Sequence, residues 1–413
     1  MTDQTADQTL AGDIRTSSLI GSAHFASHFY QLTLASLFPF MVPALGASYV
    51  TLGLVVTVMY VTSGFMQALA GVLVDRIGGA GVLIGGTLLM ALCVGLAGLT
   101  PGIWLLFPLA VGAGLGNSIY HPADLSILSH RVSERRLGRA YAVHGLAGVL
   151  GYAAAPISMI YLGQAIGWRG ALGVAALVGV VVAAVLWLNI DAIRTDERHR
   201  SRPHPVSRGA ATRDYFRLVA SPTVLMSFLF FTTLALVQIG TQTMSAAANM
   251  IHFDIDLATA GWSVTALLLG SATGIIVGGV MADRYERHEF LVALGCVWSA
   301  GFVLLIALNV PDGASIIPVM TLAGIGLGII LPSRDLLVKK AAPKGATGKI
   351  FGFVYSGLDC GSSLAPLVFA WMIDQGRAQL FWFTIMAVIL AIIPSVLRVG
   401  QGMQARPAGP DAA

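Results

Sequence analysis

Histidines and an acid gather in the first half of the chain, within runs that are otherwise apolar. His24 and His28 are four residues apart and would share one face of a helix. His121 and Asp124 are three apart and would do the same, and His144 follows after a short basic run. Because an imidazole gains or loses a proton near neutral pH, these side chains could relay protons or hold an anionic substrate.

The second half of the chain carries one acid near the middle of an apolar run. Asp359 stands roughly 16 Å into its helix at a rise of about 1.5 Å per residue, close to the membrane midplane. Ionisable groups at that depth are costly and usually mark a pathway or a site. We therefore predict that Asp359 takes up and releases the coupling proton. The alternative is a carboxylate bonded to the backbone or to a neighbouring hydroxyl.

Three other interpretations of the histidines remain open. Each ring could be a neutral hydrogen-bonding group between helices. The pattern His-x3-His at His24 and His28 is also a plausible pair of metal ligands. In the third interpretation Asp124 serves as a helix cap and has no other role. No compact set of methionines or cysteines accompanies these residues, so we predict neither a bound metal nor any cofactor.

Neutral polar and aromatic side chains in the same runs could add contacts for a polar solute. Amides both donate and accept hydrogen bonds, and tyrosine rings can stack on a planar group. The predicted substrate and proton pathway comprises His24, His28, Gln31, Asn117, Tyr120, His121, Asp124, His144, Gln238, Gln242, Tyr355 and Asp359.

The composition indicates that a membrane positions these groups. Of the 413 residues 56% are hydrophobic and only 11% are charged, whereas about 25% are charged in a typical soluble domain. We therefore predict an all-α protein with twelve transmembrane helices of roughly 20 residues each. The net charge of +4 is too small and too confined to loops to indicate nucleic-acid binding. The expected spans are 18–45, 51–74, 80–99, 103–128, 139–163, 170–190, 221–248, 258–282, 289–309, 315–338, 348–373 and 379–398.

Basic residues are expected on the cytoplasmic side of a membrane protein. With the N-terminus inside, 22 of the 24 lysines and arginines fall on the inner side, and only Arg169 and Arg377 fall outside. Both termini are thus predicted to be cytoplasmic, in the inner (plasma) membrane. The polar N-terminus lacks the features of a secretory signal, so the first helix is expected to be retained. The predicted parts are a cytoplasmic segment 1–17, a six-helix bundle 18–190, a basic cytoplasmic linker 191–220, a second six-helix bundle 221–398 and a cytoplasmic tail 399–413.

The two halves of the sequence repeat each other. The turn motif Gly-x3-Asp-Arg follows the second and the eighth span, at an offset of 208 residues, as Gly71, Asp75 and Arg76 and as Gly279, Asp283 and Arg284. At an offset of 210 residues, Pro122, Gly138-Arg139, Gly151 and Pro156 correspond to Pro332, Gly348-Lys349, Gly361 and Pro366. A parallel repeat of six-helix units, with the substrate between them, is the architecture of secondary transporters whose halves rock against each other.

The repeated motif could form the cytoplasmic gate of such a transporter. Its glycines could let helices approach closely, its aspartates could accept bonds from the exposed amides of a helix end, and its arginines could reach a carboxylate across the bundle. We assign Arg334 and Asp335, at the inner end of the tenth span, to this gate rather than to the substrate site. The alternative is a static cap at each turn.

These motifs resemble those of the major facilitator superfamily over essentially the whole chain. In that superfamily the turn motif continues as x-Gly-Arg-Arg/Lys. Here Gly78 matches, whereas Gly79 and Ala80 replace the basic pair. The resemblance implies two six-helix bundles that work by alternating access, with the first, fourth and fifth spans lining the cavity side of the first half.

Within the superfamily, the first half is similar to the fosmidomycin-resistance type of exporter. That type carries Ser-His early in the first span and Gly-x-Ser-x-Phe-His-Pro-Glu in the fourth. The corresponding residues here are Ser27-His28, Gly116, Ser118, Tyr120 in place of Phe, His121 and Pro122. The acid comes one residue late, at Asp124, and the fourth span lacks the central arginine of many proton antiporters. The resemblance favours export but does not carry drug/proton antiport over residue by residue.

We predict a proton-coupled secondary transporter, not an enzyme, that exports a small polar or anionic organic compound by alternating access. No phosphate loop of the form Gly-x4-Gly-Lys-Ser/Thr is present, so ATP bound by this chain is not the energy source. The expected partners are the substrate, protons and the lipid bilayer, with no nucleic acid and a monomeric state. The first alternative is uptake of a metabolite anion by proton symport; the others are metal-ion transport and a non-transporting membrane sensor.

Overall fold

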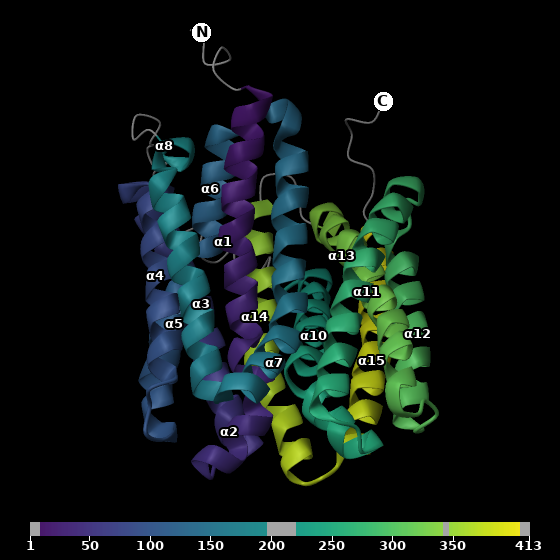
Figure 1. Cartoon of the computed structure of the whole chain (residues 1–413). Helices are drawn as coiled ribbons and strands as arrows, with labels where there is room; N and C mark the ends of the chain where they lie inside the picture. Colours follow the sequence, from purple (N-terminus) through teal and green to yellow (C-terminus); the bar gives the residue numbers. More distant parts are fainter. Residues whose placement is uncertain (1–8, 196–219, 342–346, 405–413) are drawn as a thin grey trace, which may run out of the picture. The chain divides into compact units, whose positions relative to one another are not determined.

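The computed structural model (Figure 1) describes residues 9–195, 220–341 and 347–404, with all side chains except those of residues 68, 314, 335, 338–341, 347–352 and 402–404. Within these ranges the chain forms helices and turns and no strand. It divides into two compact units, Met1–Arg202 and Pro203–Ala413. The division falls inside the predicted linker 191–220, most of which lies outside the described residues.

In the first unit, prolines break two of the predicted spans. The first span divides at Leu37, and Pro39 lies in the first turn of the short helix that follows. The fourth span divides at Ile119, because the ring of Pro122 has no N–H to donate and clashes with the preceding turn. The elements are α1 (Leu10–Ser36), α2 (Phe38–Leu45), α3 (Tyr49–Ile77), α4 (Gly79–Ala97), the 3₁₀ turn Ile103–Leu105, α5 (Leu106–Ser118), α6 (Tyr120–Arg131), α7 (Glu134–Leu188) and α8 (Ile190–Ile193).

The fifth and sixth predicted spans are both contained in α7, which has 55 residues. Its two halves meet at Gly167, whose φ of 75° and ψ of 161° lie in a region open almost only to glycine. This residue therefore lets the chain turn from one crossing into the next without a loop.

The described residues of the second unit form six long helices, as predicted for the second half of a repeat. The first of them ends at Phe253, where Asp254 adopts the left-handed conformation. The elements are α10 (Pro222–Phe253), α11 (Leu257–Arg284), α12 (His288–Ala307), the 3₁₀ turn Gly313–Ser315, α13 (Ile316–Ala341), α14 (Thr347–Asp374) and α15 (Ala378–Gln404).

Ten stretches of the described chain are long and apolar enough to cross a membrane. One of them is the whole of α7, which contains two crossings. The helix α1 is not among the ten, because His24, His28 and Gln31 lower its mean hydropathy. Counting both halves of α7 and adding α1, the described residues form twelve helical segments that can cross a membrane, and the predicted all-α fold is confirmed.

Close helix contacts in each unit occur where glycine takes the place of a side chain. A Cβ on Gly151 of α7 would lie 2.2 Å from the carbonyl oxygen of Phe25 on α1. A Cβ on Gly361 of α14 would lie 2.2 Å from the carbonyl oxygen of Thr232 on α10. Since Gly151 and Gly361 are equivalent in the repeat, α1 packs on α7 as α10 packs on α14, through the backbone contact that small residues allow in membranes.

The glycines of the predicted gate do not have this packing role. A Cβ on Gly71 or Gly279 would meet nothing within 4 Å. Within its own unit, neither glycine therefore lies at a close helix contact, and a role in the gate stays a prediction. Both lie in the last two turns of their helices, α3 and α11, where the side chains around them are largely exposed.

An ion pair that the sequence analysis did not find joins α1 to the start of α7. The carboxylate of Asp13 accepts hydrogen bonds from Nε of Arg136 at 2.6 Å and from Oγ of Ser133 at 2.7 Å. Asp13 precedes the predicted first span and is buried. Burial alone would raise its pKa, but the bonds from Ser133 and Arg136 and the charge of Arg136 together lower the pKa below the ordinary value.

The backbone contact at Gly151 can be tested with a matched substitution on the same helix. Gly151→Ala should lower the free energy of unfolding by about 1–3 kcal/mol, because α1 must move away from α7. This loss should appear as a lower thermal unfolding midpoint in detergent. Gly145→Ala, where a Cβ would meet nothing within 4 Å, should leave the midpoint unchanged or raise it slightly. Equal effects of the two substitutions would contradict this account of the packing.

The Asp13 ion pair predicts a pH dependence of stability. A carboxyl with a lowered folded-state pKa stabilises the fold above its unfolded pKa of about 3.9 and loses that contribution as the pH falls through its folded pKa. Asp13→Asn should therefore lower the free energy of unfolding by about 1 kcal/mol at pH 6, and by progressively less below pH 4. Thermal melts of both proteins across this range measure the difference. An Asn variant of the exposed Asp191 serves as the control, and a gap between Asp13→Asn and wild type that widens on acidification would refute the assignment.

Candidate functional site

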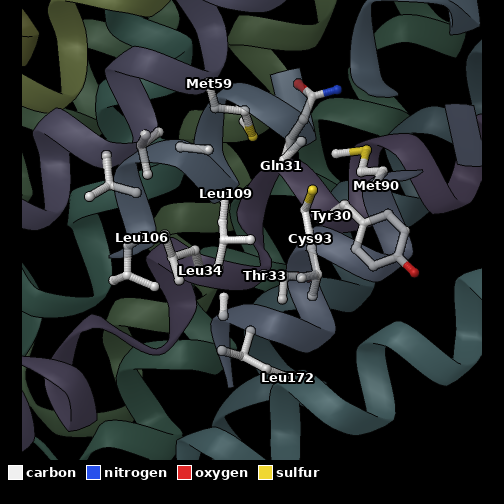
Figure 2. Close-up of a pocket in the computed structure, with 16 residues that line it drawn as sticks. Tyr30, Gln31, Thr33, Leu34, Met59, Met90, Cys93, Leu106, Leu109 and Leu172 are labelled. Carbon is white, nitrogen blue, oxygen red and sulfur yellow. The ribbon is translucent and has the colours of Figure 1, made fainter. Parts of the chain in front are cut away.

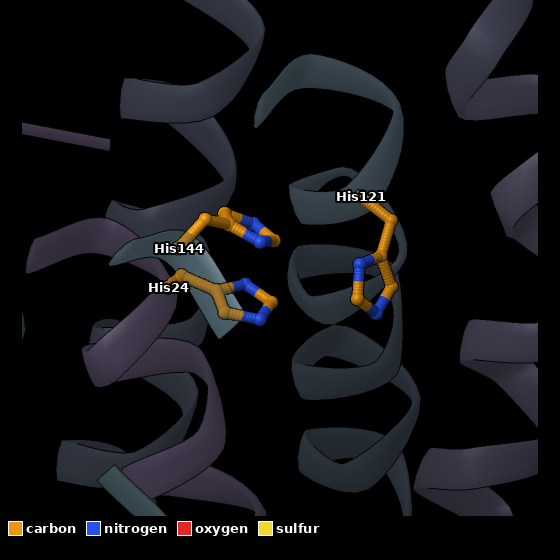
Figure 3. Close-up of side chains that lie close together, drawn as sticks. All are labelled: His24, His121 and His144. Atoms are coloured by element: carbon orange, nitrogen blue, oxygen red, sulfur yellow. The ribbon is translucent and has the colours of Figure 1, made fainter. Parts of the chain in front are cut away.

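The structure brings four of the predicted histidines together at the meeting point of α1, α6 and α7. The rings of His24 and His144 stack with centroids 3.6 Å apart and planes inclined by 25°. His121 of α6 faces this pair, with its centroid 5.2 Å from that of His24 (Figure 3). The ring centroid of His28 lies 4.3 Å from that of His24. We call these rings, together with Asp124, the histidine cluster.

The carboxylate of Asp124 lies at the centre of the histidine cluster and is completely buried. Its Oδ2 is 3.1 Å from Nε2 of His144 and 3.3 Å from Nδ1 of His24. Its Oδ1 is buried as well and has no hydrogen-bond partner among the described residues. A helix-end cap would bond backbone amides, so the contacts seen here support the interpretation of Asp124 as an ionisable site.

Glycine and proline leave the space for this arrangement. A Cβ on Gly148 would lie 2.7 Å from both His24 and His28, so α7 must present a bare backbone beside these rings. On α6, Pro122 breaks the fourth span just before Asp124. The cluster thus depends on local backbone features that are visible in the sequence.

The charges within the cluster limit how many protons it can hold. Asp124 can carry one negative charge, and the two rings beside it could each carry a positive one. Because His24 and His144 lie face to face, a second positive charge would be opposed by repulsion in a medium of low dielectric constant. A second positive charge on the stacked pair is therefore disfavoured, and His121, which faces the pair, is exposed.

The same histidines are also near enough to consider a metal ion. One ring nitrogen from each of His24, His121 and His144 lies within 4.8 Å of the others. Ligand atoms of a tetrahedral zinc ion are about 3.4 Å apart. At this upper limit the nitrogens are farther apart than the ligands of a zinc ion, so at least one ring would have to move inward to close such a site.

A second group of polar side chains extends from the cluster along α1. The amide of Asn117 donates to Oγ of Ser63 at 2.9 Å, and its Oδ1 accepts from Ser27 at 3.0 Å and from Gln31 at 3.3 Å. The hydroxyl of Tyr152 donates to Oε1 of Gln31 at 2.7 Å. Asn117 therefore joins α1, α3 and α5 in one hydrogen-bond network.

The sequence analysis assigned no pathway role to three members of this network, namely Ser27, Ser63 and Tyr152. Tyr152 connects the network to the histidine cluster, because its ring lies 4.2 Å from that of His28. The only available signal was the spacing of Ser27 and Gln31, which are one helical turn apart. By contrast Tyr120, which was predicted to belong to the pathway, is 1% exposed and lies in the packed core.

In the second unit, the predicted pathway residues lie on α10 and α14. The half-buried carboxylate of Asp359 makes no hydrogen bond or ion pair with the described residues, and Oγ of Ser363 bonds its backbone carbonyl instead. The alternative of a carboxylate held by a neighbouring hydroxyl is thus not seen there. Gln238 and Gln242 are half-buried on α10, and Oε1 of Gln242 lacks a donor among the described residues.

Arg334 differs most from its predicted surroundings. Its guanidinium carbon lies 5.1 Å from the ring centroid of Phe231 on α10 and 6.0 Å from that of Tyr355 on α14. It thus packs against aromatic faces within its own unit. The side chain of Asp335, assigned to the same gate, lies outside the described residues.

One pocket lies in the first unit, enclosed by α1, α3, α4, α5 and α7 (Figure 2). Its lining is mostly apolar, with Tyr30, Gln31 and Thr33 as polar members. At about 50 Å³ it is far smaller than the roughly 300–1,000 Å³ of sites for organic ligands. We interpret it as a packing void beside the polar network rather than as the substrate site.

Comparison with known proteins agrees with this architecture. The sequence profile of the Major Facilitator Superfamily matches residues 20–251 and 231–408, which together span nearly the whole chain. The chain belongs to the major facilitator superfamily. Its members are transporters rather than enzymes, and the repeated halves and twelve crossings described above are the fold of that superfamily.

Several relatives within the superfamily are transporters or efflux pumps. A 3-(3-hydroxy-phenyl)propionate transporter of Escherichia coli is 31% identical over 150 residues, which cover 35% of this chain and 36% of that transporter. A multi-drug resistance efflux pump PmrA homolog of Lactococcus lactis is 22% identical, with 76% of each chain covered. A solved bacterial homolog of the human lysosomal transporter Spinster matches the fold with a TM-score of 0.80 at 13% identity, over 97% of this chain and all of that one.

The superfamily turn motifs lie at the ends of two helices. Asp75 and Arg76 are exposed in the last turn of α3, and Asp283 and Arg284 are exposed in the last turn of α11. Each pair ends a helix of its own unit, as predicted from the repeat. Their role as a gate remains a prediction.

The network around Asn117 predicts a loss of stability on substitution. Asn117→Ala removes the acceptor of Ser27 and Gln31 and the donor to Ser63, which should cost about 1–2 kcal/mol for a buried network in a membrane. Thermal unfolding in detergent measures the cost. The control is Ser158→Ala, because Oγ of Ser158 bonds only carbonyls of its own helix; a larger effect at Ser158 would show that the network does not hold the helices together.

Proposed function

We propose that this superfamily member couples the movement of protons to the transport of a small polar or anionic organic compound. The observation that carries the proposal is the buried carboxylate of Asp124, whose Oδ2 lies within 3.3 Å of a ring nitrogen of both His24 and His144. Ionisable groups inside membrane bundles are rare and mark proton relays or substrate sites. A carboxylate that shares protons with imidazoles is a chemically suitable relay near neutral pH.

In this mechanism the histidine cluster takes up a proton on one side of the membrane and releases it on the other. Uptake neutralises the cluster, and release restores the negative charge of Asp124. Asp359 of the second unit, which lacks a partner among the described residues, is a second place where a proton can bind. Transport follows if the two protonation states favour different arrangements of the two units, as in alternating access.

Export is the direction that we favour. The relatives include multi-drug resistance efflux pumps, and the first half resembles the fosmidomycin-resistance type of exporter. The E. coli relative named as a 3-(3-hydroxy-phenyl)propionate transporter supports an aromatic carboxylate as substrate and keeps uptake by proton symport as the alternative. We further propose that the protein acts as a monomer in the inner membrane, with both termini and the gate motifs on the cytoplasmic side.

The decisive experiment is proton flux in proteoliposomes that contain the purified protein. Phosphonates, carboxylates and cationic drugs are added in turn, and a pH-sensitive dye inside the vesicles reports proton movement. Asp124→Asn preserves the shape of the side chain but cannot ionise, so substrate-driven proton flux should fall by about a hundredfold or more. The sign of the flux in wild type separates antiport from symport.

The control for this experiment is Asp191→Asn, an exposed acid on the short helix α8, which should transport like wild type. Coupled flux that persists in Asp124→Asn with unchanged pH dependence would exclude the histidine cluster as the proton site. Absence of proton flux with every compound, while binding is still measurable, would instead favour a uniporter or a sensor.

A further inference from the structure

The second unit carries a permanent positive charge at the position equivalent to Asp124. The repeat offset of 210 residues pairs Pro122 with Pro332, and each proline lies two residues before a charged one. Asp124 on α6 thereby corresponds to Arg334 on α13. The two halves thus place opposite charges at the same position of the fold.

The facing helix is matched in the same way. Gly151 lies against Phe25 of α1, and its equivalent Gly361 lies against Thr232 of α10. Phe25 therefore corresponds to Thr232, an offset of 207 residues between α1 and α10. His24 then corresponds to Phe231. The corner that holds an imidazole against a carboxylate in the first unit holds a phenyl ring near a guanidinium group in the second.

In this second corner the guanidinium group lies near two aromatic rings. The rings of Phe231 and Tyr355 are 5.0 Å apart and inclined by 52°, and Arg334 lies within 6.0 Å of both ring centroids. Phe231 is completely buried, whereas Arg334 and Tyr355 are half-buried. A guanidinium group near aromatic rings retains its N–H donors in the plane of the group, where they can form paired bonds.

We propose that Arg334, held against Phe231 and Tyr355, binds the carboxylate or phosphonate group of the transported compound. This inference rests on the proposed function and names the substrate class. A guanidinium group cannot release its charge and matches two oxygens of an anion at once.

Asp359 offers a way to link this site to protons. It follows Tyr355 by four residues on α14 and so lies one helical turn away, on the same side of the helix. An ionised Asp359 would repel an arriving anion, and a protonated one would not. Proton uptake at Asp359 would then favour occupation of the site at Arg334.

The test is equilibrium binding of three probes to the purified full-length protein: benzoate and phenylphosphonate as anions, and benzamide as the neutral analogue. Wild type should bind at least one anion more tightly than benzamide. Arg334→Gln should weaken binding of that anion on the order of 10- to 100-fold and leave benzamide unchanged. Arg334→Lys, which keeps the charge but loses the paired donors, should recover only part of the affinity.

Two further variants keep the test specific. Tyr355→Leu removes a ring without changing the charge and should also weaken binding of the anion. Arg377 is an exposed arginine 5.8 Å from the ring of Trp371, and Arg377→Gln should leave binding of the anion unchanged. Unchanged anion affinity in Arg334→Gln, or a wild type that binds neither anion, would overturn the inference. Anion binding that depends on Arg334 but evokes no proton flux in vesicles would support this site and refute the proton coupling proposed above.

Discussion

The backbone contact between α1 and α7 is the constraint on which the first unit depends. Gly151 lies against the carbonyl oxygen of Phe25, and one turn earlier Gly148 leaves room for the rings of His24 and His28. With a side chain at either position the two helices could not lie this close, and His144 could not stack on His24. The chemistry of the cluster therefore depends on two residues that have no functional group.

The repeat keeps the glycine and proline positions in both halves, but the side chains near them differ. Gly361 and Pro332 of the second unit match Gly151 and Pro122 of the first. The side chains at the corner differ completely, with imidazoles and a carboxylate in one half and aromatic rings with an arginine in the other. Packing constrains the two glycines, because a Cβ there would collide with the backbone of the facing helix, whereas the side chains at the corner have changed between the halves.

Much of the fold was predictable, because apolar length and the positions of proline and glycine are properties of the sequence alone. The association of His24, His28, His121, Asp124 and His144 was also predictable, because helix spacing groups them within their own spans and the family resemblance implies that the first, fourth and fifth spans line one cavity. The roles of Tyr152 and Asp13 were not, because hydropathy does not say which way a side chain points. Arg334 was assigned to the gate from its depth, which carries no information about the rings of Phe231 and Tyr355 beside it.

The shared oxygen of Asp124 has an energetic consequence for a complete cycle. If the cluster exchanges one proton, uptake of one monoanion together with that proton moves no net charge across the membrane. Export of a monoanion in exchange for an entering proton moves two positive charges inward. Each charge is worth about 2.3 kcal/mol per 100 mV of membrane potential, so an exporter built on this site would be driven by voltage as well as by the pH gradient, whereas an importer would respond to the pH gradient alone.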